Sequence, residues 1–92
     1  MKIEVDEDDL EIVMMCAMRY TYYRSSYAVE HIQDFIVKYC HENVIDKFIK
    51  DIENFLADYK TYNFPDKYVI QSWENTITKL NYKKNTLNNI LY

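Results

Sequence analysis

The sequence has no glycine and a single proline, Pro65. Tight hairpin turns depend on glycine because it readily adopts positive φ angles. The loops that hold nucleotide phosphates depend on it because it lets the backbone approach the ligand closely. We therefore expect neither a hairpin-based sheet nor nucleotide chemistry of the familiar loop types. The composition favours α-helices.

Long apolar runs are also missing. No stretch approaches the roughly 18 apolar residues that a membrane-spanning helix needs, and the first residues are acidic where a secretory signal would be basic. Cysteine occurs twice, at Cys16 and Cys40, and neither belongs to a C-x-x-C pair. These features predict a cytoplasmic protein with two buried, free thiols.

Charge is distributed unevenly along the 92 residues, whose formal net charge is −4. Residues 1–18 contain six acidic side chains against one lysine, whereas residues 60–92 contain five lysines against two acidic side chains. The resulting electrical polarity can steer a partner, but it does not select a fold.

Four segments have apolar side chains at the spacing of an α-helix. They span about residues 7–24, 27–40, 44–60 and 67–82. We predict an all-α fold, in which a single domain packs about four helices into a compact bundle. An acidic arm at residues 1–6 would precede the bundle. Residues 83–92 would follow it as a tail that either docks on the bundle or frays.

Capping and packing signals refine this prediction. Asp6, Asn43 and Asp66 stand where they can cap the first, third and fourth helices. Phe64, which the following proline keeps out of the helical conformation, is expected to fold back into the core. Trp73 lies in the middle of an apolar stripe and should anchor that core.

The first predicted helix is apolar around most of its circumference. One stripe contains Leu10, Val13, Met14 and Ala17, and the other side is filled by Ile12, Met15, Cys16 and Met18. We therefore expect a central helix that is buried on most sides. Because three short neighbours would not cover such a helix completely, we also expect a homodimer.

Side chains that could carry catalysis are few. Glu30, His31 and Asp34 fall on nearby helical positions, but their spacing matches no recognised metal site. Cys40 and His41 are adjacent, and adjacent residues on a helix point about 100° apart, which does not suit a nucleophile and its base. We predict a protein without enzyme activity, metal or cofactor.

Tyrosine and arginine gather between residues 17 and 29, which hold four of the ten tyrosines and both arginines. These residue types dominate the hot spots of protein interfaces. We predict that this junction, together with the acidic first turn, binds a protein partner. The predicted contact residues are Arg19, Tyr20, Tyr22, Tyr23, Arg24, Tyr27, Asp6, Glu7, Asp8 and Asp9. The alternative is structural: tyrosines that pack at a helix corner, arginines that cap carbonyls or pair with acids, and acids that serve as N-terminal helix charges.

A second functional hypothesis is a small nucleic-acid-associated regulator. Phosphates attract cations, and unpaired bases stack on aromatic rings. Lys79, Lys83 and Lys84 would supply the positive charge in the basic C-terminal half. The overall acidity of the chain opposes this hypothesis, and we place it second.

Part of the sequence resembles a group of small uncharacterised phage and prophage proteins. The shared features are Arg19-Tyr20, Arg24, Ser26 and Tyr27-Ala28-Val29, and a later Trp73 followed by Leu80. The glycine that this group often has between the tyrosine and the arginine is replaced here by Thr21-Tyr22-Tyr23. The resemblance implies an origin in a mobile element. It also implies a role in the host cytoplasm, where small acidic helical proteins bind and inhibit a host protein or defence complex, as anti-CRISPR proteins do.

Overall fold

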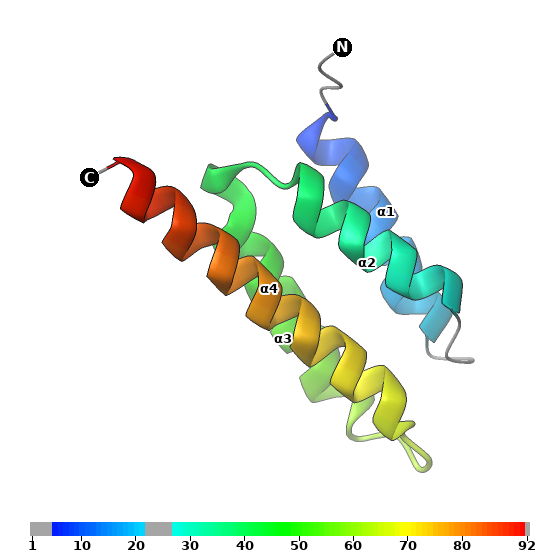
Figure 1. Cartoon of the computed structure of the whole chain (residues 1–92). Coiled ribbons are helices and arrows are strands. Elements are labelled where there is room, and N and C mark those ends of the chain that lie inside the picture. Colours follow the sequence, from blue (N-terminus) through cyan, green and yellow to red (C-terminus); the bar gives the residue numbers. More distant parts are fainter. Residues whose placement is uncertain (1–4, 22–26, 92) are drawn as a thin grey trace.

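The computed structural model describes residues 5–21 and 27–91 (Figure 1), with the backbone alone described at residues 27 and 87–91. The helices are α1 (Glu7–Thr21), α2 (Tyr27–Tyr39), α3 (Ile45–Tyr59) and α4 (Lys67–Leu91), and a 3₁₀ turn, η1 (Glu42–Val44), precedes α3. The described ranges contain no strand. The predicted all-α bundle is confirmed.

The predicted end of the fourth helix differs from that in the structure. Helix α4 continues from Tyr82 to Leu91, through residues predicted to form a tail. No proline or glycine interrupts this stretch, and Thr86 Oγ1 donates a hydrogen bond to the Tyr82 carbonyl across the predicted end, at 2.9 Å. At the start of the bundle, residues 22–24 of the predicted first helix lie outside the described residues.

Helix starts are set by aspartate at two positions, as predicted. Asp6 Oδ1 accepts the Asp8 N–H at 2.8 Å, and Asp66 Oδ1 accepts the Tyr68 N–H at 2.8 Å. Each contact satisfies a backbone donor that has no partner within the helix. The prediction of an Asn43 cap is wrong, because Asn43 lies inside η1 and the N-cap of α3 has no side-chain hydrogen bond.

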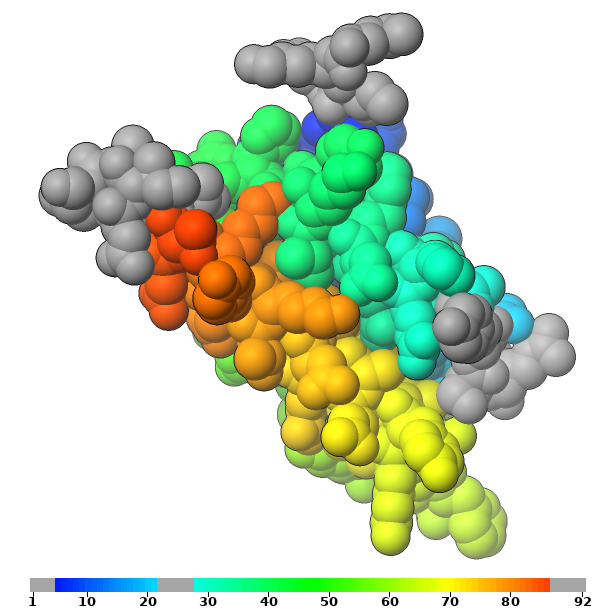
Figure 2. Space-filling view, viewed as in Figure 1, coloured from blue at the N-terminus to red at the C-terminus, as the bar shows by residue number. Residues whose placement is uncertain are grey.

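The bundle consists of two helical pairs, α1 with α2 and α3 with α4, which pack side by side (Figure 1). Helix α4 also contacts α2, and α1 also contacts α3. On one face of the molecule, the side chains of α2 and α4 meet along both helices (Figure 2). No helix among the described ranges is long and apolar enough to cross a bilayer.

Trp73 is the centre of the core, as predicted, with 0% of its surface exposed. Its indole Nε1–H donates to Thr21 Oγ1 at 3.3 Å, which ties α4 to the end of α1. Its ring meets Phe55 edge-on, with 5.8 Å between centroids. The other fully buried apolar side chains include Leu10, Met14, Ile36, Ile45, Phe48, Ile52 and Leu80.

Two packing predictions are wrong. Phe64 is 94% exposed and does not fold into the core. The loop between α3 and α4 is instead held by Tyr59, whose ring is buried. The Tyr59 hydroxyl accepts a hydrogen bond from the Asp66 N–H at 2.8 Å. Helix α1 is not buried on most sides, because it packs against α2 and α3 on one side only, and Ile12 and Met15 on the other side are exposed.

Candidate functional site

A row of exposed side chains runs along the side of α1 that faces away from the bundle. We call it the α1 outer face, and it consists of Ile12, Met15, Cys16, Arg19 and Tyr20. The exposed fractions are 58% for Ile12, 56% for Met15 and 39% for Tyr20. The spacing of three and four residues places all five side chains on adjacent turns of one helical face.

The opposite side of α1 carries the side chains that hold the helix in the bundle. Leu10, Met14, Ala17, Met18 and Thr21 are buried against the neighbouring helices. Once these residues face inward, the helical period turns the α1 outer face to the surface. Helix α1 therefore has two apolar stripes, only one of which is covered by the described part of the chain.

The structure describes the predicted tyrosine and arginine junction only in part. Arg19 and Tyr20 are exposed and belong to the α1 outer face. Tyr22, Tyr23 and Arg24 lie outside the described residues, and Tyr27 begins α2 with a side chain that is also outside them. Helix α1 thus places two of the six predicted junction residues on its accessible side.

The predicted acidic residues lie at the other end of α1. Asp6 is the N-cap described above, and Glu7 is half-buried. Asp8 and Asp9 are exposed in the first turn, where negative charge is favoured by the helix dipole. Asp6 therefore has a structural role, whereas Asp8 and Asp9 are accessible to a partner.

Beside the α1 outer face, Glu11 fixes α1 to α3. Lys47 Nζ donates to Glu11 Oε2 at 2.8 Å. The hydrogen bond to Glu11 and the carboxylate charge raise the pKa of Lys47. Because the lysine is exposed, the pair contributes little to stability, but it helps to orient α1 on α3.

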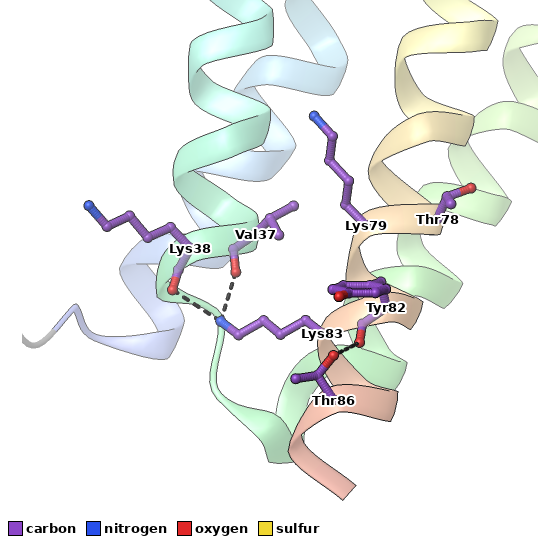
Figure 3. Close-up of a pocket in the computed structure, with 7 residues that line it drawn as sticks. All are labelled: Val37, Lys38, Thr78, Lys79, Tyr82, Lys83 and Thr86. Atoms are coloured by element: carbon purple, nitrogen blue, oxygen red, sulfur yellow. Dashed lines mark hydrogen bonds between the residues drawn. The ribbon is translucent and has the colours of Figure 1, made fainter. Parts of the chain in front are cut away.

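Lys83 reaches from α4 to the C-terminal end of α2. Its ammonium donates to the carbonyl oxygens of Val37, Lys38 and Cys40 at 2.7, 3.0 and 2.6 Å, and Figure 3 shows the contacts to Val37 and Lys38. These carbonyls lie at the C-terminal end of α2, where carbonyl oxygens run out of backbone N–H partners within the helix. A cation is favoured at this end of a helix. Burial lowers the pKa of Lys83.

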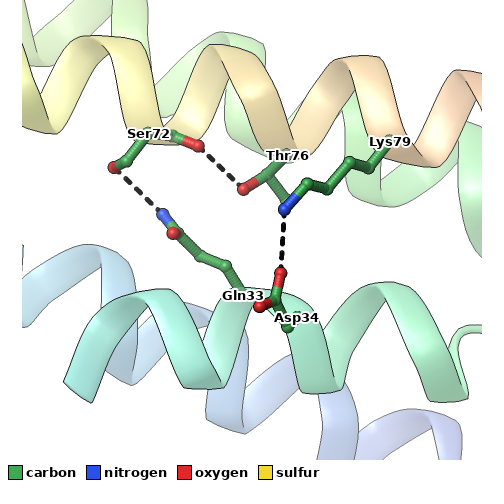
Figure 4. A network of polar contacts seen from close by, with 5 residues as sticks. All are labelled: Gln33, Asp34, Ser72, Thr76 and Lys79. Carbon is green, nitrogen blue, oxygen red and sulfur yellow. Dashed lines mark hydrogen bonds and ion pairs between the residues drawn. The ribbon is translucent and has the colours of Figure 1, made fainter. Parts of the chain in front are cut away.

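The other two lysines of the nucleic-acid hypothesis also have partners within the chain. Lys79 pairs with Asp34 of α2 at 2.9 Å, next to a hydrogen bond of 3.2 Å from Gln33 Nε2 to Ser72 Oγ (Figure 4). Lys84 pairs with Asp46 of α3 at 2.7 Å. The three ammonium groups thus join α4 to the rest of the bundle.

An open pocket of about 590 Å³ lies between α2 and α4 (Figure 3). It is lined by Val37, Lys38, Thr78, Lys79, Tyr82, Lys83 and Thr86. Small-molecule sites usually have a few polar groups that converge on the ligand. Here the ammonium groups of Lys79 and Lys83 bind Asp34 and the α2 carbonyls instead, so the pocket offers no such convergence.

The two cysteines differ in accessibility, and both are free. Cys40 is buried, as predicted, and its burial raises the pKa to about 11. Such a thiol is a poor nucleophile because little thiolate forms. The prediction that Cys16 is buried is wrong, because it lies on the uncovered side of α1. Among the described residues, no three His, Cys, Asp or Glu side chains are grouped so as to hold a metal ion.

Comparison with known proteins identified no relative of this chain. No family model, no curated protein and no solved structure matches the chain. The functional inference therefore rests on the surface and the sequence of this chain.

Proposed function

We propose that this protein acts by binding another protein, without catalysis of its own, and that the α1 outer face is its binding surface. The observation that carries the proposal is the row of Ile12, Met15 and Cys16 exposed between polar helix ends. Single exposed apolar residues are normal, but a contiguous row is typical of a surface that a partner covers. Arg19 and Tyr20 extend the row with residue types that are common in interface hot spots.

The absence of enzyme activity is part of the proposal. It is supported by the small number of candidate catalytic side chains in the sequence and by the raised pKa of the buried Cys40 thiol. An exposed helical face suits docking because its side chains are held in place by the rigid helix behind them.

The target that we propose is a host protein or defence complex, which a phage or prophage protein of this kind would inhibit in the host cytoplasm. The resemblance of the residues around Arg19 and Trp73 to small phage proteins supports this target class, with anti-CRISPR proteins as one example. The acidic charge of the chain favours a target with a basic surface.

The nucleic-acid regulator is the less well supported alternative. Lys79, Lys83 and Lys84 would each have to leave an acidic or carbonyl partner before binding phosphate. Such a regulator should lose affinity steeply as the salt concentration rises.

Affinity capture from a nuclease-treated lysate of the native host tests the proposal. The wild-type chain should retain host proteins that the Met15→Glu variant does not, because a charge in the apolar row opposes its burial. Tyr68→Glu is the matched control, since Tyr68 is exposed on α4 and receives the same new charge. Capture that is equal for wild type and Met15→Glu, or that disappears with nuclease, would contradict the proposal.

A further inference from the structure

The α1 outer face has opposite charges at its two ends. Asp8 lies one turn before Ile12, Arg19 lies one turn after Met15, and both charged side chains are exposed. At 100° per residue, Asp8, Ile12, Met15, Cys16 and Arg19 fall within about 100° of the helix circumference. In the part of the chain that the structure describes, neither Asp8 nor Arg19 forms a salt bridge. The face therefore has an acidic end, an apolar middle and a basic end.

This arrangement is complementary to itself. If two α1 helices lie antiparallel about a two-fold axis midway between Ile12 and Met15, Ile12 is level with the partner's Met15 and Asp8 is level with the partner's Arg19. We propose that the α1 outer face binds a second copy of this chain in this antiparallel arrangement. The inference rests on the proposed function, because it uses the same face: a second copy covers the apolar row until a host protein takes its place.

A second copy fits the face for three physical reasons. The two-fold axis generates two Asp8–Arg19 ion pairs from one pair of residues. It covers Ile12 and Met15 of both copies with apolar surface. The antiparallel direction places the positive N-terminal end of each helix beside the negative C-terminal end of the other.

The dimer should be weak. The α1 outer face lies on one helix of 15 residues, and interfaces of this size belong to the small, transient class. We expect dissociation in the micromolar range, so that both monomer and dimer can be observed in one concentration series.

The same arrangement would bring together the acidic first turn of α1 and the Arg19–Tyr20 end of α1, which lie apart within one chain. Asp8 and Arg19 are eleven residues apart, which is about 16 Å along the helix. In the dimer, the acidic first turn of one copy lies beside Arg19 and Tyr20 of the other. A host protein would have to displace the second copy before it could cover the apolar row.

Charge reversal tests the register of the two helices. In sedimentation velocity from micromolar to millimolar concentration, wild type should dimerise, and Asp8→Arg and Arg19→Asp should each weaken the dimer by about tenfold or more, because each creates two like-charged pairs. The double variant restores opposite charges and should recover most of the lost affinity. The antiparallel arrangement would be overturned if the single reversals left the dimer affinity unchanged. It would also be overturned if the double reversal failed to restore that affinity.

Apolar substitutions provide the second measurement. Met15→Glu should be monomeric at concentrations where Tyr68→Glu, with the same new charge on α4, still dimerises. Circular dichroism confirms that each variant is folded. A wild-type chain that is monomeric at every concentration overturns this inference, yet leaves the proposed function intact if it still captures host proteins. A wild-type chain that dimerises but captures no host protein would contradict the proposed function and leave this inference intact.

Discussion

Replacing Lys83 with methionine should destabilise the protein far more than the same replacement at Lys84. Methionine keeps most of the aliphatic stem and removes the ammonium. The change therefore deletes the hydrogen bonds of 2.7, 3.0 and 2.6 Å to the three carbonyls at the end of α2. Lys84 loses one exposed contact, its 2.7 Å salt bridge to Asp46.

The magnitude follows from the number of bonds and their surroundings. Burial lowers the pKa of Lys83, which means that lost hydration offsets part of the benefit of the charge. We therefore count each hydrogen bond in the lower half of the usual range of about 0.5–1.5 kcal/mol, which makes the total loss about 2 kcal/mol. For a domain of this size, that loss lowers Tm by about 10 °C. For Lys84→Met we expect less than about 0.5 kcal/mol, because exposed ion pairs contribute little.

Urea and thermal unfolding followed by circular dichroism at 222 nm measure both variants. The two substitutions remove the same charge from neighbouring positions of α4, so a general effect of net charge would change both proteins equally. Equal midpoints for Lys83→Met and Lys84→Met would refute the reasoning that the Lys83 ammonium caps α2.

Two further predictions concern the core and the thiols. Trp73→Phe removes the indole donor to Thr21 and leaves a gap at the centre of the bundle. The free energy of unfolding should therefore fall by about 2 kcal/mol. An unchanged urea midpoint would mean that this contact does not stabilise the bundle. With a disulfide reagent at pH 8, the native protein should show one fast thiol, which disappears in Cys16→Ser. Cys40 should react about 100-fold more slowly than an ordinary thiol, because its pKa is raised from 9.0 to about 11. Two equally fast thiols in the folded protein would contradict the burial of Cys40.

Local features of the sequence predicted the helices and much of the core. The period of apolar residues located all four helices, and aspartate capping located the starts of α1 and α4. Trp73 was predicted as the core anchor because it lies in the middle of a single apolar stripe. These predictions succeeded because they depend on neighbours within one or two helical turns.

The candidate binding surface was predicted only in part. Arg19, Tyr20, Asp8 and Asp9 were identified from their residue types, and the structure places them in accessible positions. Met15, with the neighbouring apolar residues of the row, was assigned to the interior instead. The spacing of three and four residues was visible in the sequence, but helix α1 has two such stripes, and periodicity cannot tell which of them faces the bundle.

Residue order alone therefore dictated the number of helices, most of their ends and the tryptophan at their centre, because those features arise from short-range periodicity and capping. Packing between distant segments settled the rest. Contacts of α2 and α3 with one side of α1 left Ile12 and Met15 on the surface. The approach of α4 to the end of α2, more than forty residues earlier in the chain, placed the Lys83 ammonium on the carbonyls at the end of α2. Both outcomes depend on which surfaces meet in three dimensions, and that information is spread over the whole chain.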